Sequence, residues 1–182
     1  MNKLLLLPLA FLALPALGAE PGWKAMVEKE LPRLGHRNWI VIADSAYPLQ
    51  SGQGIETAAV EGNQVEVVRE VLDLLKKSKH VRPVVHLDAE LPFVPEAEAK
   101  GISAYRQDLA VLLKEFKQVS LPHEEIIGKL DKAGKTFKVL IIKTPLALPY
   151  TSVFLELDCG YWGAEQEKKL RQAILRGNNG KR

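Results

Sequence analysis

The chain has 182 residues, a formal net charge of +3, and nearly balanced numbers of basic (25 Lys+Arg) and acidic (22 Asp+Glu) residues. The charges are mixed along the chain and form no basic stripe with interleaved aromatic residues, which argues against a nucleic-acid-binding protein. A single cysteine, Cys159, excludes an intrachain disulfide, so stability must come from an apolar core or from oligomerisation.

The first 19 residues are typical of a secretory signal peptide. Lys3 supplies a positive charge, residues 4–17 are apolar and uncharged, and Gly18 and Ala19 offer small side chains for cleavage. The apolar run is too short to span a bilayer, so a retained anchor is the less favoured alternative. We therefore expect a single mature domain over residues 20–182 with a helical tail over 158–182. It would be secreted or periplasmic, and free of the membrane after cleavage.

Apolar periodicity predicts helices and strands in alternation along the mature chain. Val65, Val68 and Leu72 recur at helical spacing, whereas Trp39–Ala43 is a continuous apolar run typical of a strand buried on both faces. Ser103 is expected to cap a helix. In chain order we expect helix 23–34, strand 39–43, helix 65–75, strand 81–87, helix 103–116, helix 122–130, strand 137–142, strand 150–157 and helix 165–176. This alternation predicts an α/β fold with a largely parallel sheet flanked by helices.

The strand Trp39–Ala43 is bounded by two residues that can carry chemistry. Asp44 follows its carboxyl end, which is where ligands collect in parallel sheets. His36 lies eight residues earlier, in the loop that enters the strand. An extended strand would hold the two side chains far apart, so they can meet only if the loop folds back.

Most conventional catalytic motifs are absent from the sequence. It contains no G-x-S-x-G elbow, no phosphate-binding G-x-x-x-x-G-K-[ST] loop, no G-x-G-x-x-G and no H-E-x-x-H or C-x-x-C pair. His86 and Asp88 lie two residues apart on an expected strand and could supply two metal ligands from one face, but no third ligand is nearby. We therefore expect neither a metal nor a cofactor.

Two stretches of the sequence resemble a known family. The pattern L-G-H-x-[ND]-x-I-V-I-A-D-[SA]-x-x-P over residues 34–48 resembles the N-terminal signature of the D-ribose pyranase and L-fucose mutarotase family. Residues 139–144 followed by 149–155 look like the family's closing strand, basic-threonine loop and P-Y-x-N strand. His123, with the residues up to Ile127, resembles the helix start of the pyranase branch.

The resemblance implies a pyranase/mutarotase-like fold and assigns roles at the matching positions. His36 matches the family's catalytic histidine, and Asp44 the carboxylate that binds this histidine and the sugar. His123 and Tyr150 match residues that line the sugar pocket, and Ser152 takes the place of the usual asparagine. Asn38, where the family more often has aspartate, and the Pro145–Leu146 pair also depart from the family pattern.

The implied activity is an isomerase that interconverts ring forms or anomers of a reducing monosaccharide such as ribose or fucose. Opening a hemiacetal needs one group to accept a proton and another to donate one, and a histidine that titrates near neutrality can do either. The resemblance also implies a homo-oligomer whose sites are completed by a neighbouring subunit, with Tyr150 acting across the interface.

Other interpretations of these residues remain open. Without the resemblance, His36 would be interpreted as a surface or capping residue, and Asp44 as the cap of a turn. Tyr150 would be an aromatic residue of the core or its rim, and His123 a residue of the first helical turn. A sugar-binding or structural relative of the same fold without turnover is the main alternative function. An enzyme that uses the same acid–base pair on another small carbonyl compound is a third.

Overall fold

The computed structural model of the protein describes residues 22–179, and the expected signal peptide lies outside them. The elements are, in chain order, α1 (Trp23–Glu30), β1 (Trp39–Ala43), β2 (Ile55–Ala59), α2 (Gln64–Lys77), β3 (Val81–Asp88), α3 (Ile102–Leu113), β4 (Gln118–Leu121), α4 (His123–Gly134), β5 (Val139–Lys143), β6 (Val153–Cys159) and α5 (Ala164–Asn179). Two short 3₁₀ turns, η1 (Leu31–Arg33) and η2 (Leu91–Phe93), follow α1 and β3.

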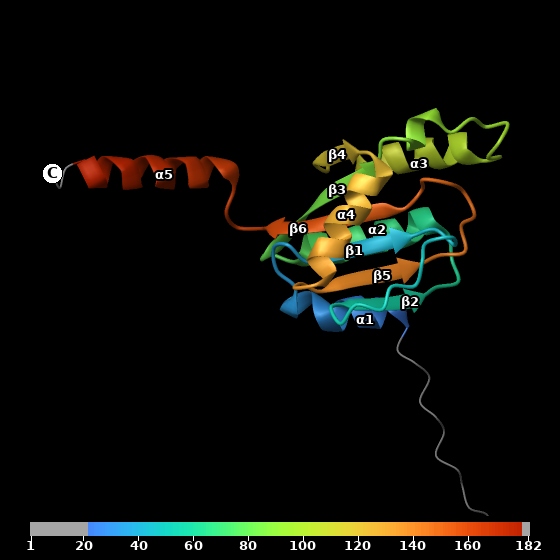
Figure 1. Cartoon of the computed structure of the whole chain (residues 1–182), viewed down its shortest axis with the longest axis horizontal. Helices are drawn as coiled ribbons and strands as arrows, with labels where there is room; N and C mark the ends of the chain where they lie inside the picture. The colour runs from blue at the N-terminus through green and yellow to red at the C-terminus, as the bar shows by residue number, and fades with distance from the viewer. Residues whose placement is uncertain (1–21, 180–182) are drawn as a thin grey trace, which may run out of the picture.

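The six described strands form one mixed, largely parallel sheet in the order β2-β5-β1-β6-β3-β4 (Figure 1). β1 pairs in parallel with β5, and β3 pairs in parallel with β4. β6 is antiparallel and lies between β1 and β3, which therefore point the same way. The predicted α/β fold with a helix-flanked, largely parallel sheet is confirmed.

The sheet is covered on both faces because its central strands are apolar on both sides. β1 is buried along its whole length. Ile40 and Ile42 pack with the apolar residues of α1, α2 and α3 on one face. Trp39 and Val41 pack with Ile126 and the rest of the apolar side of α4 on the other face. In Figure 1, α4 accordingly lies in front of β1 and β5.

Sequence periodicity missed the two outermost strands, β2 and β4. Both are short, and neither contains a fully buried residue, so they lack the apolar run that reveals a central strand. The expected cap at Ser103 is wrong as well. The Glu96 carboxylate accepts the backbone N–H groups of Gly101 and Ser103, at 2.6 and 2.9 Å, and so caps α3 in its place.

The C-terminal helix α5 projects away from the rest of the molecule (Figure 1). β6 continues through Cys159, so the helical part of the expected tail begins at Ala164 rather than at residue 158. Among the residues that the structure describes, no helix is long and apolar enough to cross a membrane.

Candidate functional site

Four of the five residues singled out in the sequence come together at one edge of the sheet. Since β1, β3 and β4 run in the same direction, their carboxyl ends share an edge with the amino end of the antiparallel β6. This edge brings together Asp44 after β1, Asp88 at the end of β3, and His123 after β4. Tyr150 and Ser152 arrive at the same edge just before β6. We call these five residues the carboxyl-edge cluster.

Asp44 and Ser152 form one half of this cluster. The Ser152 hydroxyl donates to Asp44 Oδ2 at 2.7 Å and accepts the backbone N–H of Asp44 at 3.1 Å. The other carboxylate oxygen, Oδ1, accepts the N–H of Ala46 at 2.9 Å. Ser152 is almost fully buried, whereas Asp44 is half-buried. The serine therefore orients a carboxylate that is still accessible to a ligand.

His123 and Asp88 form the other half. His123 Nδ1 lies 3.1 Å from Asp88 Oδ2, and the backbone N–H of His123 donates to both carboxylate oxygens of Glu90 at 3.1 Å. These two contacts fix the first residue of α4 from the end of β3. With Nδ1–H donating to Asp88, the Nε2 atom of a partly exposed imidazole is left to exchange protons.

Asp88 is an unusual carboxylate because its side chain is shut off from water. It is only 1% exposed, and its Oδ1 atom has no hydrogen-bond partner within the described residues. Burial raises the pKa of the Asp88 carboxyl, while the hydrogen bond and charge of His123 act in the opposite sense. The negative charges of Glu90 and Asp44 raise the pKa of Asp88 further. Asp44, in one half of the cluster, therefore acts electrostatically on Asp88 in the other half.

Tyr150 lies against His123, with the ring centroids 5.7 Å apart in an edge-to-face arrangement. Its backbone is left-handed (φ 58°), and Arg37 (φ 74°) is the other non-glycine residue with a positive φ in the part of the chain that the structure describes. Such strain persists only where the surroundings hold it, and it is concentrated at functional sites. Beside Tyr150 lies an open hollow of about 600 Å³, lined by Phe93, Val94 and Glu90.

A second tyrosine, Tyr47, lies beneath the same edge. It is buried against Phe154, and its hydroxyl has no partner among the described residues. Burial raises the pKa of Tyr47 to about 12, and the charges of Asp131, Asp44 and Asp88 add to the effect. Tyr47 therefore remains a protonated hydroxyl at neutral pH.

His36, the remaining residue singled out in the sequence, lies at the opposite edge of the sheet. β1 separates it from Asp44, and at about 3.3 Å per residue this strand alone spans roughly 16 Å. The entering loop does not fold back: Arg37 N–H donates to the Leu157 carbonyl at 2.9 Å, and Leu157 N–H donates to Asn38. One chain therefore does not bring His36 and Asp44 together, because the loop is tied to the far end of β6.

Sequence reasoning missed Asp88 as a member of this site and gave it only as a possible metal ligand. The rule that selected Asp44, a carboxylate where a buried strand ends, applies equally to Asp88. Within the part of the chain that the structure describes, no three or more His, Cys, Asp and Glu side chains are grouped so that they could hold a metal ion. His86 and Asp88 instead each bond a different partner, Glu156 and His123.

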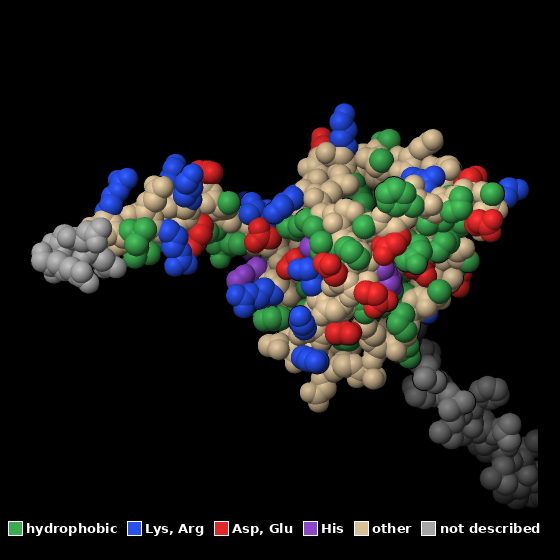
Figure 2. All heavy atoms as spheres, turned by 45° about the horizontal axis from the view of Figure 1, so that its top comes forward, with side chains coloured by type: hydrophobic (Ala, Val, Ile, Leu, Met, Phe, Trp, Pro, Cys, Tyr) green, Lys and Arg blue, Asp and Glu red, His purple; other side chains and the backbone are tan. Residues whose placement is uncertain are grey.

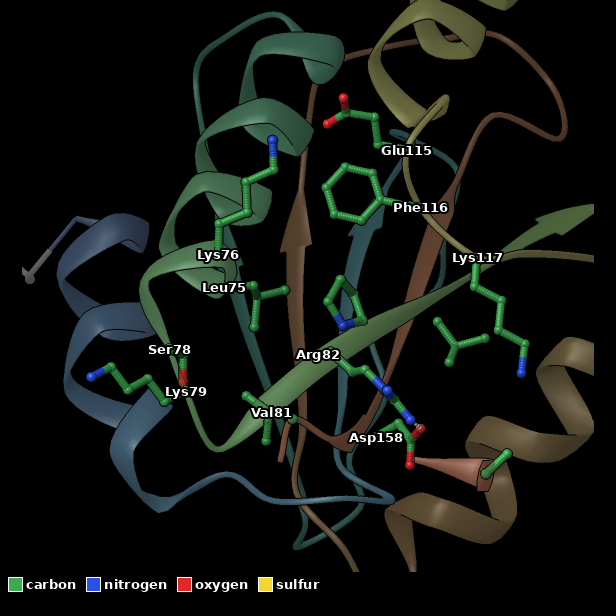
Figure 3. Close-up of a pocket in the computed structure, with 14 residues that line it drawn as sticks. Leu75, Lys76, Ser78, Lys79, Val81, Arg82, Glu115, Phe116, Lys117 and Asp158 are labelled. Carbon is green, nitrogen blue, oxygen red and sulfur yellow. Dashed lines mark hydrogen bonds and ion pairs between the residues drawn. The ribbon is translucent and has the colours of Figure 1, made fainter. Parts of the chain in front are cut away.

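A larger hollow, of about 810 Å³, lies elsewhere (Figure 3). It is lined by the end of α2, the start of β3 and the segment after α3, and by none of the five residues selected from the sequence. In it Arg82 points to Asp158, with which it is bonded at 2.7 Å, and Lys76 lies 5.2 Å from the ring centroid of Phe116. Arg82 and Asp158 therefore neutralise each other at the wall of this hollow.

Comparison with known proteins places the fold but matches no close relative. No family model and no curated protein matches the chain. Among solved structures, Bacillus subtilis RbsD complexed with D-ribose is similar at a TM-score of 0.51 and 23% identity, over 73% of this chain and 91% of RbsD. The Streptococcus pneumoniae fucose mutarotase complexed with L-fucose gives a TM-score of 0.46 and 21% identity, over 71% and 89%. The chain thus has the fold of RbsD, which confirms at the level of the fold the resemblance to the D-ribose pyranase and L-fucose mutarotase family.

Proposed function

We propose that this protein interconverts the ring forms or anomers of a reducing monosaccharide by acid–base ring opening. The observation that carries the proposal is the geometry of the carboxyl edge. A histidine oriented by a buried carboxylate, His123 on Asp88, shares this edge with a second carboxylate, Asp44, which a serine orients. Ring opening requires positioned groups that accept and donate protons, and the open hollow lined by Tyr150 and Glu90 lies at the same edge.

The reaction follows from the roles of these groups. One group accepts the proton of the anomeric hydroxyl while another donates a proton to the ring oxygen, and the bond between the anomeric carbon and the ring oxygen breaks. Ring closure on the other face, or through another hydroxyl, reverses both transfers and returns the protons. His123 Nε2 can serve in either direction, because Asp88 holds the ring by Nδ1. Asp44 accepts hydrogen bonds from sugar hydroxyls and orients the ring.

The role of His36 requires a second copy of the chain. His36 matches the family's catalytic histidine by sequence resemblance. In one chain, however, His36 lies at the edge of the sheet opposite to Asp44. If His36 and Asp44 act on the same sugar, they must come from two subunits. We therefore propose a homo-oligomer in which the His36 edge of one subunit faces the carboxyl edge of its neighbour.

The substrate we propose is a free, unphosphorylated aldose, such as ribose or fucose. Asp44, Asp88 and Glu90 make the cluster acidic, and they would repel a phosphorylated or carboxylated sugar. The likeness to RbsD complexed with D-ribose supports ribose as the first sugar to test. The signal-peptide pattern of residues 1–19 supports export, which an N-terminal sequence of the protein recovered from outside the cytoplasm, beginning near Glu20, would test.

Magnetisation-exchange NMR on a panel of aldoses tests the function. We expect faster exchange between the ring forms of at least one sugar, and a loss of about 10²–10⁴-fold in His123→Ala. His80→Ala, in the turn that precedes β3, is the matched control and should retain the wild-type rate. A protein that binds sugars but accelerates no exchange would instead be the non-catalytic relative. Accelerated turnover of another small carbonyl compound alone would give the third interpretation.

A further inference from the structure

A second group of titratable side chains lines a recess around His36. The recess has a volume of about 350 Å³ and lies between the start of β1, β3 and β6, with His36, His86, Lys117 and Glu156 on its walls. In Figure 2, histidine side chains reach the surface of the molecule at more than one place, with acidic side chains beside them. We call this hollow the His36 recess.

His86 is a buried residue of the recess and holds Glu156. Its side chain is nearly fully buried, with the ring centroid 5.0 Å from that of Trp39. His86 Nε2 lies 2.9 Å from Glu156 Oε2, while Nδ1 is buried without a partner among the described residues. The hydrogen bond to His86 lowers the pKa of the Glu156 carboxyl, against the effect of its burial. Glu156 is therefore an ionised acceptor in a fixed position, and its side chain is still about one-third exposed.

The packing of the sheet does not require a polar pair at the positions of His86 and Glu156. Glu156 and Phe154 lie on the face that α4 covers, and an apolar residue at position 86 would bury well beside Trp39. A buried polar pair contributes little net stability over apolar packing of the same volume. Where such a pair opens onto a recess, a role in binding explains it better.

The loop that carries His36 is also held in place. Arg37 takes up its left-handed conformation while its N–H bonds the Leu157 carbonyl, at 2.9 Å. Asn38 Oδ1 accepts the N–H of Gly35 at 2.7 Å, and its Nδ2 donates to the Lys138 carbonyl at 3.2 Å. His36 thus projects from a rigid turn into the same recess that Glu156 lines.

The charges of the recess indicate the kind of ligand. The recess is lined by two cations, Arg37 and Lys117, and by two carboxylates, Glu156 and Asp158. Asp158 is already bonded to Arg82 at 2.7 Å, which leaves Glu156 as the available carboxylate acceptor. A ligand with several hydroxyl groups, such as a sugar, satisfies both the donors and the acceptor.

We propose that the His36 recess is the second wall of the sugar site, in which Glu156, held by His86, accepts a hydrogen bond from a hydroxyl of the sugar that His36 contacts. This inference rests on the proposed function. Glu156 and His36 then belong to one half of the site and His123, Asp44 and Tyr150 to the other half. The sugar lies between the recess of one subunit and the carboxyl edge of the next.

The first test is the kinetics of Glu156→Gln, which removes the charge at nearly constant shape. We expect KM for the sugar to rise about tenfold or more, since a hydrogen bond to a charged group is lost. Glu66→Gln, which removes an exposed carboxylate of α2 outside the recess, is the matched control and should leave KM unchanged. His86→Phe should reproduce the loss, because it frees Glu156, and circular dichroism reports whether each variant is folded. Unchanged KM in a folded Glu156→Gln overturns the inference.

Co-expression of two variants assigns Glu156 to its half of the site, at a sugar concentration well below the wild-type KM, where Glu156→Gln alone keeps about a tenth of the wild-type rate. Glu156→Gln with His123→Ala should reach about a quarter of the wild-type rate, since random pairing leaves that share of sites intact. Glu156→Gln with His36→Ala should not exceed the rate of Glu156→Gln alone, and a higher rate in this mixture would overturn the inference. If His36→Ala and His123→Ala do not complement each other, the two-subunit arrangement of the proposed function fails, and KM alone decides on Glu156.

A wild-type protein that turns over no aldose would refute the proposed function but would still test the recess. The readout is then the imidazole NMR signals of His36 and His86 during titration with D-ribose. Shifts that occur in the wild type and in Glu66→Gln but are lost in Glu156→Gln support the inference. Signals that do not move, or that move equally in all three proteins, overturn it.

Discussion

Asp88 shows how a single residue can cost stability while serving the candidate site. Its carboxyl is buried with one oxygen unpartnered among the residues that the structure describes, and the net effect is a pKa raised above the usual range. For an acid whose pKa is higher in the folded protein, the stabilising contribution is full below the unfolded pKa and is lost as the pH rises through the folded value. The orientation of His123 is what the protein gains in return.

Asp88→Asn should therefore change stability in a pH-dependent way. Relative to wild type, the variant should be more stable, or less destabilised, at pH 7 than at pH 4, because only the wild type must bury a charge at pH 7. Urea unfolding at the two pH values measures this difference. Asp73→Asn, on the exposed side of α2, should show no such difference, and an equal effect of Asp88→Asn at both pH values would contradict the prediction.

Ser152 has a similarly specific effect on Asp44. The variant Ser152→Ala removes both the donor to Asp44 Oδ2 and the acceptor of the Asp44 N–H. We expect it to lower the free energy of unfolding by about 1.5–3 kcal/mol and to raise KM for the sugar, because the carboxylate loses its orientation. Ser120→Ala, at an exposed position of β4, is the control. Wild-type stability and KM in Ser152→Ala would show that the contact has no role.

At the scale of elements, two helices on the other face of the sheet position the segment that carries Tyr150 and Ser152. Gln64, the first residue of α2, is 2% exposed and donates to the Thr151 carbonyl at 2.5 Å and to the Tyr105 hydroxyl at 2.9 Å. The hydroxyl of Tyr105, in α3, donates to the same carbonyl at 2.6 Å. Thr144, after β5, donates its hydroxyl to Gln64 Oε1. This buried network lies directly next to the strained Tyr150 and holds it.

Tyr105→Phe should loosen that network at one point. We expect a loss of about 1–3 kcal/mol in unfolding free energy, since the buried Thr151 carbonyl loses a donor. The imidazole NMR signal of His123 should shift too, because the ring of Tyr150 lies edge-to-face with it. Gln64→Leu should have the same two effects. Tyr161→Phe, at an exposed tyrosine after β6, should have neither. A destabilised Tyr105→Phe with an unmoved His123 signal would limit the network to a structural role.

At the scale of the whole molecule, the two candidate halves of the site lie at opposite edges of the sheet, so subunits must associate to bring them together. The carboxyl-edge cluster and the His36 recess both carry a histidine near a carboxylate, and β1 and β6 keep them apart. A closed ring of subunits, each presenting one edge to the next, would join every recess to a cluster. This arrangement uses both sets of side chains without any change in the fold.

The two-subunit site leads to a direct prediction on mixed oligomers. His36→Ala and Asp44→Asn should each abolish most sugar exchange, and co-expressed they should regain about a quarter of the wild-type rate, since the two defects fall on opposite walls. Light scattering should show at least two chains per particle. A monomer, or mixed oligomers as inactive as either variant alone, would contradict the arrangement.

The projecting helix α5 should be dispensable for the stability of the body. Its described side chains are nearly all exposed, so truncation after Gly163 should change the free energy of unfolding by less than about 1 kcal/mol. Urea unfolding of the truncated and full chains measures this. A large loss of stability that depends on protein concentration would show that α5 packs in the oligomer instead.

The sequence by itself determined the elements whose burial is evident from a local pattern of apolar residues. β1 is found at its predicted bounds because all five of its residues are apolar, and Asp44 follows its carboxyl end as expected. The α/β class follows from the same short-range periodicity. β2 and β4 escaped because strands at the edge of a sheet bury only part of their surface and need no apolar run.

Only the tertiary structure decided which side chains meet. Ser152 bonds Asp44 across 108 positions of sequence, and Asp88 rather than Asp44 is the carboxylate beside a histidine at the carboxyl edge. Periodicity reveals strands but not their order, and the insertion of the antiparallel β6 between β1 and β3 is what brings these residues together. The same order ties the loop of His36 to the far end of β6, so the pairing that the sequence suggested within one chain is excluded by the length of one strand.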